Sequence, residues 1–143
     1  MSGIGRQLMA CAIAGLWATG AMAEVRLAGI FGEHMVLQRD APIRIWGRAD
    51  AGEAVQVSLG RHQARAVAAA DGRWSVQLPA MRAGGPHVLK ARARNELVVE
   101  DVLIGDVWFC SGQSNMEWTL AQSQDAAREI AAADAPQIRH VKI

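Results

Sequence analysis

The prediction of the fold starts from residues 102–118, VLIGDVWFCSGQSNMEW. The first part, residues 102–110, is rich in Val, Ile, Trp and Phe and lacks the alternation of a half-exposed strand, so it predicts a strand buried on both faces. Sheets of such strands present ligands at the carboxyl ends of the strands. That end carries Gly112, Gln113, Ser114 and Asn115, and the sequence therefore predicts a site in the turn around Ser114.

Two blocks of the sequence resemble a known enzyme family. The segment GQSNM, residues 112–116, resembles the nucleophile block of the sialate O-acetylesterases, which are carbohydrate acetylesterases of the SGNH type of serine hydrolase. Residues 27–60 resemble the amino-terminal β-domain of the same family, and the two blocks stand in the family's order. The resemblance implies the N-terminal portion of a secreted serine esterase that removes O-acetyl groups from sialic acid or another acetylated sugar.

Each residue of the GQSNM turn has an expected role. The tight turn at Gly112 should expose the Ser114 hydroxyl, and the backbone N–H of Ser114 is an expected oxyanion donor. We expect Gln113 and Asn115 to hold the turn by hydrogen bonds. The resemblance implies that Ser114 is the nucleophile and forms an acetyl-enzyme intermediate, which water then clears.

The sequence does not supply a catalytic base for Ser114. A serine nucleophile needs a base, usually a histidine oriented by an acid. In the family that this chain resembles, both come from an Asp-x-x-His block near the carboxyl end, and a Gly and an Asn in later blocks add oxyanion donors. Residues 116–143 match none of these blocks, since His140 has Gln137 three places before it. We therefore expect little or no hydrolysis by this 143-residue chain alone.

Residues 24–100 predict an antiparallel β-sandwich or jelly-roll-like domain. Three short segments alternate apolar and polar residues, which places one face of each strand on a core and the other in water. Turn-forming residues such as Asp71 and Gly72 separate the segments. The apolar residues of the three segments are Ile43 and Ile45; Val55, Val57 and Leu59; and Trp74, Val76 and Leu78.

Two groups of side chains in this domain have a functional and a structural interpretation. Trp46 and Trp74 could stack on sugar rings, but tryptophans in alternating strands more often pack in a core. Lys90, Arg92 and Arg94 could attract an acidic sugar, but they alternate with apolar residues as the water-facing side of a strand does. We favour the structural interpretation for both groups.

Residues 101–143 predict the start of an α/β hydrolase domain that is incomplete in this chain. After the Ser114 turn, residues 120–133 predict a helix with Ser123 as its N-cap, and residues 137–143 predict a second strand. Strand, helix and strand make the first β-α-β unit of a parallel sheet. The expected fold class is therefore mainly β, a sandwich followed by the first β-α-β unit of a truncated SGNH-type domain.

The first 23 residues predict a cleaved signal peptide. Arg6 is the only charged residue before Glu24, residues 8–18 are mostly apolar, and residues 21–23, Ala-Met-Ala, form a cleavage site. A transmembrane anchor is the alternative, but the apolar run is shorter than the ~20 residues that span a bilayer. We expect a secreted or periplasmic protein.

Composition excludes several other classes of function. Without Arg6, the chain after residue 23 has 14 basic and 14 acidic residues, which gives no electrostatic case for binding nucleic acid or a membrane surface. Cys110 is the one cysteine after residue 23, so no intramolecular disulfide is expected, and we predict it to be a small buried core residue. The four histidines lie far apart in the sequence, so we expect no metal site and no cofactor.

A non-catalytic function is the alternative to an esterase. The chain would then be a β-sandwich module that binds carbohydrate or a protein partner, and Ser114 would have no catalytic role. A coding region that continues into an Asp-x-x-His block would favour the esterase.

Overall fold

The computed structural model describes residues 24–142. The signal-peptide prediction, residues 1–23, lies outside the described residues. Strands arranged in two sheets dominate the structure, which confirms the mainly β fold class.

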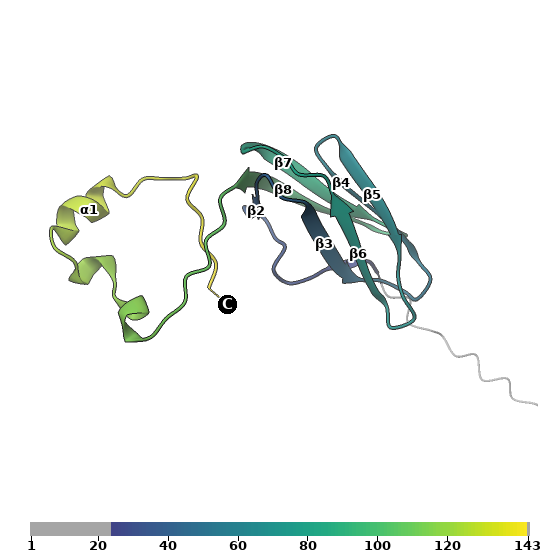
Figure 1. Cartoon of the computed structure of the whole chain (residues 1–143), viewed down its shortest axis with the longest axis horizontal. Helices are drawn as coiled ribbons and strands as arrows, with labels where there is room; N and C mark the ends of the chain where they lie inside the picture. Colours follow the sequence, from purple (N-terminus) through teal and green to yellow (C-terminus); the bar gives the residue numbers. More distant parts are fainter. Residues whose placement is uncertain (1–23, 143) are drawn as a thin grey trace, which may run out of the picture.

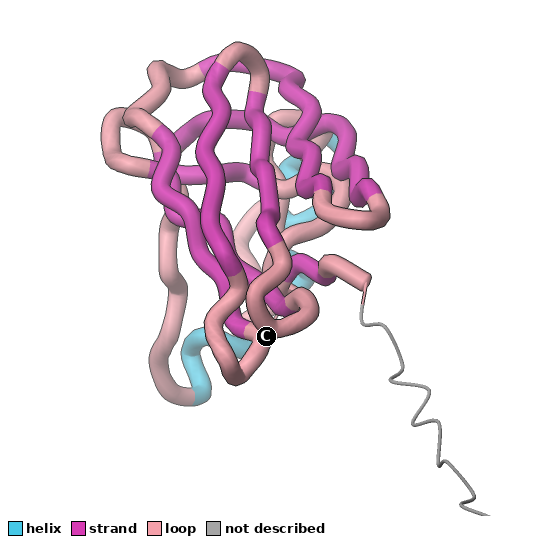
Figure 2. Tube along the Cα trace, turned by 90° about the vertical axis from the view of Figure 1, so that its right-hand side faces the viewer, coloured by secondary structure: helices cyan, strands magenta, loops and turns pink. Residues whose placement is uncertain are grey.

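The two sheets form a sandwich (Figure 1, Figure 2). The smaller sheet has the order β1-β3-β6 and the larger sheet has the order β2-β8-β7-β4-β5. Neighbouring strands are antiparallel except β2 and β8, which run parallel. The strands are β1 (Arg26–Leu27), β2 (Val36–Gln38), β3 (Ile43–Arg48), β4 (Ala54–Leu59), β5 (His62–Val67), β6 (Arg73–Leu78), β7 (Gly84–Arg92) and β8 (Glu96–Gly105).

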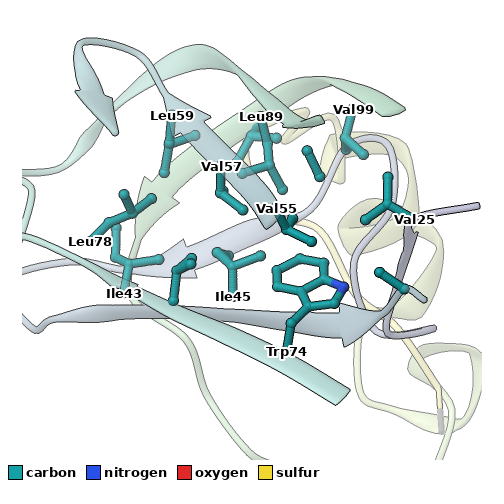
Figure 3. Packing of buried hydrophobic residues seen from close by; sticks show 14 of the residues in the cluster. Val25, Ile43, Ile45, Val55, Val57, Leu59, Trp74, Leu78, Leu89 and Val99 are labelled. Atoms are coloured by element: carbon teal, nitrogen blue, oxygen red, sulfur yellow. The ribbon is translucent and has the colours of Figure 1, made fainter. Parts of the chain in front are cut away.

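Alternating side chains from both sheets fill the space between them. Figure 3 shows side chains from both sheets, including Ile45 and Leu89, which face one another across this core. Full burial of a Val, Leu or Ile side chain contributes about 1.5–3 kcal/mol, so this layer is the main source of stability. The alternation predicted from the sequence is confirmed, because all its apolar residues are buried: Ile43, Ile45, Val55, Val57, Leu59, Trp74, Val76 and Leu78.

The prediction that both tryptophans pack in the core is right for Trp74 and wrong for Trp46. Trp74 is 3% exposed, whereas Trp46 is 40% exposed. Because successive side chains of a strand point to opposite faces and Ile45 points inward, Trp46 lies on the outer face of β3. There its ring meets the ring of Phe31 edge-on, with centroids 4.6 Å apart and planes at 75°.

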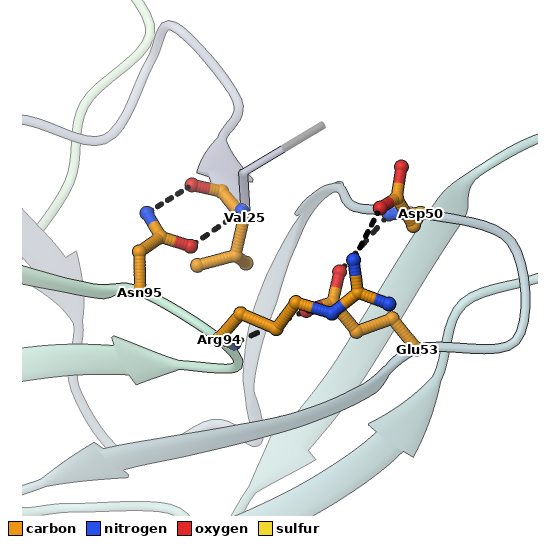
Figure 4. A network of polar contacts seen from close by, with 5 residues as sticks. All are labelled: Val25, Asp50, Glu53, Arg94 and Asn95. Carbon is orange, nitrogen blue, oxygen red and sulfur yellow. Dashed lines mark hydrogen bonds and ion pairs between the residues drawn. The ribbon is translucent and has the colours of Figure 1, made fainter. Parts of the chain in front are cut away.

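Polar contacts fasten the first described residues to the turn between β7 and β8 (Figure 4). The Asn95 side chain accepts the backbone N–H of Val25 at 2.8 Å and donates to the carbonyl of Val25 at 3.3 Å. Next to it, the exposed Arg94 pairs with Asp50 at 3.1 Å and with Glu53 at 3.8 Å. Arg94 therefore faces water, as predicted, and also makes ion pairs that the sequence analysis did not anticipate.

A β-bulge interrupts β8 shortly before its end. Leu89 of β7 lies opposite Val99, but His87, two residues away, lies opposite Val102, three residues away. The extra residue on β8 falls next to Asp101, whose φ of 51° lies in the left-handed region. The bulge shifts the phase of the alternation, so that both Val99 and Val102 point into the core. This strand also runs across residue 100, where the sequence analysis places a domain boundary; that boundary stays a prediction.

The predicted strand over residues 102–110 is correct only as far as Gly105, and it belongs to the sandwich. Trp108 and Phe109 are 84% and 87% exposed, and Cys110 is exposed and not a buried core residue. A strand buried on both faces needs neighbouring strands and covering helices, and the described chain offers none to residues 106–110.

The β-α-β unit is not formed within residues 24–142. The predicted helix over residues 120–133 is two shorter pieces, the 3₁₀ helix η2 (Leu120–Gln122) and the helix α1 (Ala126–Ala132), and the N-cap of α1 is Asp125 in place of Ser123. Residues 137–142 contain no strand. In Figure 1 this part of the chain, with α1, extends away from the sandwich. Within residues 24–142, no strand follows β8 that could form a parallel sheet for it to pack against.

Candidate active site

Ser114 is the first residue of the short 3₁₀ helix η1 (Ser114–Glu117), which follows the exposed loop after β8. Gln113 precedes it in an extended conformation, with φ −98° and ψ −154°. The backbone N–H of Met116 donates to the carbonyl of Gln113 at 2.9 Å, and that of Trp118 donates to the carbonyl of Asn115 at 3.3 Å. Backbone carbonyls of Gln113 and Asn115 thus hold the turn that presents Ser114.

Gly112 makes room for this turn. A Cβ atom at residue 112 would lie 2.7 Å from Cγ of Met116, which folds back over the glycine. That separation is shorter than a van der Waals contact, so a larger residue at position 112 would require the exposed Met116 side chain to move.

The Ser114 hydroxyl is exposed and is not hydrogen-bonded by any histidine or carboxylate of residues 24–142. His34 is instead bonded to Asp101, and His140 is exposed in the stretch that follows α1. The described chain therefore presents a serine hydroxyl without the base that would take its proton. The backbone N–H of Ser114, expected to be an oxyanion donor, likewise makes no hydrogen bond in this part of the chain.

Polar contacts at the root of this segment connect it to the sandwich. The Arg39 guanidinium donates to Asp106 at 2.8 Å, and the backbone N–H of Val107 donates to the side chain of Gln38 at 3.0 Å. The hydrogen bond to Asp106 and the charge of that carboxylate raise the pKa of Arg39. The direction in which the chain leaves β8 is therefore fixed by side chains next to β2.

A second connection involves three residues that the sequence analysis did not single out. The Asp101 carboxylate accepts a hydrogen bond from His34 Nδ1 at 2.7 Å and one from Arg139 Nη2 at 3.0 Å, and the same nitrogen forms an ion pair with the other carboxylate oxygen at 2.9 Å. The bond from His34, followed by that from Arg139, holds the pKa of the Asp101 carboxyl below its usual value. The three residues are far apart in the sequence, so no local pattern could have indicated the cluster.

Residues 24–142 contain neither a cluster of metal ligands nor a membrane-spanning helix. Across residues 24–142, no three side chains of the His, Cys, Asp and Glu types gather closely enough to hold a metal ion. Over the same range, no helix is long and apolar enough to cross a membrane.

The known proteins that this chain resembles in sequence and in structure are acetylesterases. Models of protein families give no match. The chain is 39% identical over 117 residues to the sialate O-acetylesterase of Homo sapiens, a match that covers 73% of this chain and 22% of the relative. It is 38% identical over 123 residues to the sialate O-acetylesterase of Rattus norvegicus, covering 78% of this chain and 23% of the relative.

Among solved structures, the chain is similar to the crystal structure of a carbohydrate acetylesterase from Xanthomonas citri. The two share 44% sequence identity with a TM-score of 0.75 over 78% of this chain and 26% of that structure. The chain thus spans about a quarter or less of the length of each relative, at 22%, 23% and 26%.

Proposed function

The chain belongs to the sialate O-acetylesterase family, and we propose that it forms the part of a serine esterase that carries the nucleophile. The substrate is an O-acetylated sialic acid or a related acetylated sugar. The observation that carries the proposal is the exposed hydroxyl of Ser114 on the first residue of η1, directly after the Gly112 turn.

In the proposed reaction, Ser114 Oγ attacks the carbonyl carbon of the acetyl ester. A base takes the serine proton, the bond between the acetyl carbon and the sugar oxygen breaks, and the sugar leaves with that proton. Water then attacks acetyl-Ser114 and releases acetate. The backbone N–H of Ser114, which has no partner within the described residues, is placed to stabilise the oxyanion, and one such donor is typically worth about 10²- to 10³-fold in rate.

No histidine of residues 24–142 is bonded to Ser114, so the proposal assigns the base and its orienting acid to a part of the enzyme outside these residues. We therefore propose that the 143-residue chain is inactive alone and acts as a fragment of a longer enzyme. Secretion or export to the periplasm is part of the proposal and rests on residues 1–23. Mass analysis of the exported protein should give a first residue of Glu24, and an unprocessed Met1 would contradict export.

The decisive experiment compares Ser114→Ala with Ser111→Ala in the complete enzyme, using p-nitrophenyl acetate and an O-acetylated sialic acid. Both serines lie in the same exposed loop, but only Ser114 has a catalytic role in the proposal. Ser114→Ala should lower kcat by at least about 10⁴-fold, because it removes the group that is acylated. Ser111→Ala should change kcat little.

Two outcomes would contradict the proposal. If Ser114→Ala left the activity of the complete enzyme unchanged, the chain would be better described as a non-catalytic module that binds carbohydrate or a partner. If the 143-residue chain hydrolysed p-nitrophenyl acetate with a rate that Ser114→Ala abolished, the base would lie within this chain.

A further inference from the structure

The stretch that carries Ser114 leaves the sandwich after Gly105 and is tied back to it at Asp101, within β8. Arg139 Nη1 donates to the backbone carbonyl of Asp101 at 2.6 Å, while Nη2 reaches both carboxylate oxygens at 3.0 and 2.9 Å. Within residues 24–142, no other residue beyond Val107 is hydrogen-bonded to the sandwich. Arg139 therefore joins the segment to a residue 38 positions earlier in the sequence, and the segment would otherwise be fixed only at its root.

The burial of this pair sets it apart from the other ion pairs of the segment. The side chain of Arg139 is 19% exposed and that of Asp101 is 36% exposed, whereas Arg128 on α1 is 76% exposed and pairs only within its own helix turn. A partly buried guanidinium that makes several bonds to one residue fixes both distance and orientation. An exposed pair such as that of Arg128 is worth little.

The Asp101 carboxylate that meets these partners lies at the β-bulge of β8. Asp101 and His34 both have a positive φ, 51° and 62°, a conformation that costs non-glycine residues on the order of 1 kcal/mol or more each. The backbone N–H of Leu103 donates to the carbonyl of Met35 at 3.0 Å, which holds the two strained segments side by side. Such strain persists where surrounding contacts enforce it, and it is concentrated at functional sites.

We propose that Arg139 and Asp101 form a positioning clamp that holds the Ser114 segment in place relative to the sandwich. The expected effect of the clamp on kcat rests on the proposed role of Ser114. Its effect on the mobility of the segment does not depend on that role. Neither residue touches the reacting atoms. They act by closing the loop at both ends, which removes conformations in which Ser114 is turned away from a base supplied by the rest of the enzyme.

The consequence for catalysis is a loss of rate without a matching loss of binding. A misplacement of about 1 Å between reacting groups can lower a rate by about 10²-fold. Arg139→Ala in the complete enzyme should therefore lower kcat by about 10- to 10²-fold and change KM by less. Arg139→Lys keeps the charge but loses the planar fork, so it should recover only part of kcat.

The mechanical test uses ¹⁵N relaxation on residues 24–143 with Arg139→Ala, Asp101→Asn and, as the matched control, Arg128→Ala. We expect order parameters over residues 111–138 to fall in the first two variants, toward the values below about 0.6 that are typical of flexible chain. Asp101→Asn keeps the size and the tolerance for positive φ, so its effect reports the lost charge. Arg128→Ala should leave the order parameters outside α1 unchanged.

The two readouts separate failure of the clamp from failure of the proposed function. Unchanged order parameters in Arg139→Ala would overturn the clamp, whatever the activity. Lower order parameters together with an unchanged kcat would show that the tie exists but does not position Ser114, which also overturns the proposal. If Ser114→Ala were fully active while Arg139→Ala loosened the segment, the proposed function would fail and the tie would stand.

Discussion

Residues 25–105 and residues 106–142 have similarly apolar stretches but opposite fates in the fold. Every buried residue of the described chain lies between Val25 and Ile104, whereas residues 106–142 contain none. The second region nevertheless contains Trp108, Phe109 and Ile138, which are 79–87% exposed. The difference shows that burial depends on a partner surface, since an apolar run without one stays in water.

The largest expected effect is the difference in stability loss between two Ile→Ala substitutions, one in each region. Ile45→Ala opens a cavity in a core where Ile45 is fully buried, and it should lower the free energy of unfolding by about 2–5 kcal/mol. Ile138→Ala removes the same atoms from an exposed site and should change it by less than about 0.5 kcal/mol. Urea denaturation followed by circular dichroism measures both values. Equal losses in the two variants would mean that residues 106–142 also contribute to a core.

An intermediate effect is expected from acidification, which protonates the Asp101 carboxylate and so weakens the contact with Arg139 that connects the two regions. Because the folded-state pKa of Asp101 is lowered by His34 and Arg139, the tie contributes stability above the unfolded-state pKa of about 3.9. That contribution is lost as the pH falls through the lowered folded-state pKa, when the carboxylate is protonated.

Relaxation spectra at pH 7 and at a series of pH values stepped down below about 3.9 measure this release. We expect residues 111–138 to become more mobile in acid, while the strands of the sandwich keep their order. In Asp101→Asn, which has no carboxyl to titrate, the segment should already be mobile at pH 7 and change little on acidification. A segment that loosened equally with pH in this variant would assign the effect to another group.

Substitution of the exposed aromatic residues Trp108 and Phe109 should have the smallest effect on stability. It should have a clear effect on self-association. Replacing both Trp108 and Phe109 by Ser should leave the urea midpoint unchanged, because neither side chain is in the core. It should reduce self-association in sedimentation experiments, because large exposed apolar patches drive it. Val67→Ser, at a residue of β5 that is 65% exposed, is the control and should not reduce association. Self-association that persisted unchanged in the double variant would point to another surface.

The sandwich could be predicted from the sequence because alternation is a local signal. Ile43, Ile45, Val55 and Val57 each lie in a strand whose two faces differ, so the pattern and the burial agree. The same method failed over residues 106–110, because no local signal in an apolar run shows whether neighbouring strands are present to cover it.

In the candidate site, too, local features could be predicted from the sequence and long-range contacts could not. Ser114 and its turn follow from a short contiguous motif, and the structure places Gly112, Gln113, Ser114 and Asn115 in one exposed turn. The contacts among His34, Asp101 and Arg139 join residues 67 and 38 positions apart, so only three-dimensional structure could bring them together. Contacts of this kind carry no periodicity that a sequence could reveal.

The parallel pairing of β2 with β8 also has a consequence for how the chain folds. Val36 pairs with Leu103, and Val25 is bonded to Asn95, so β2 and the residue just before β1 find their partners near the end of the sandwich. Contacts between such distant residues must first overcome the entropy of closing a long loop, which slows folding. On a ribosome, β1 and β2 emerge well before β8, and the larger sheet cannot acquire its last edge strand until residue 105 has left the exit tunnel.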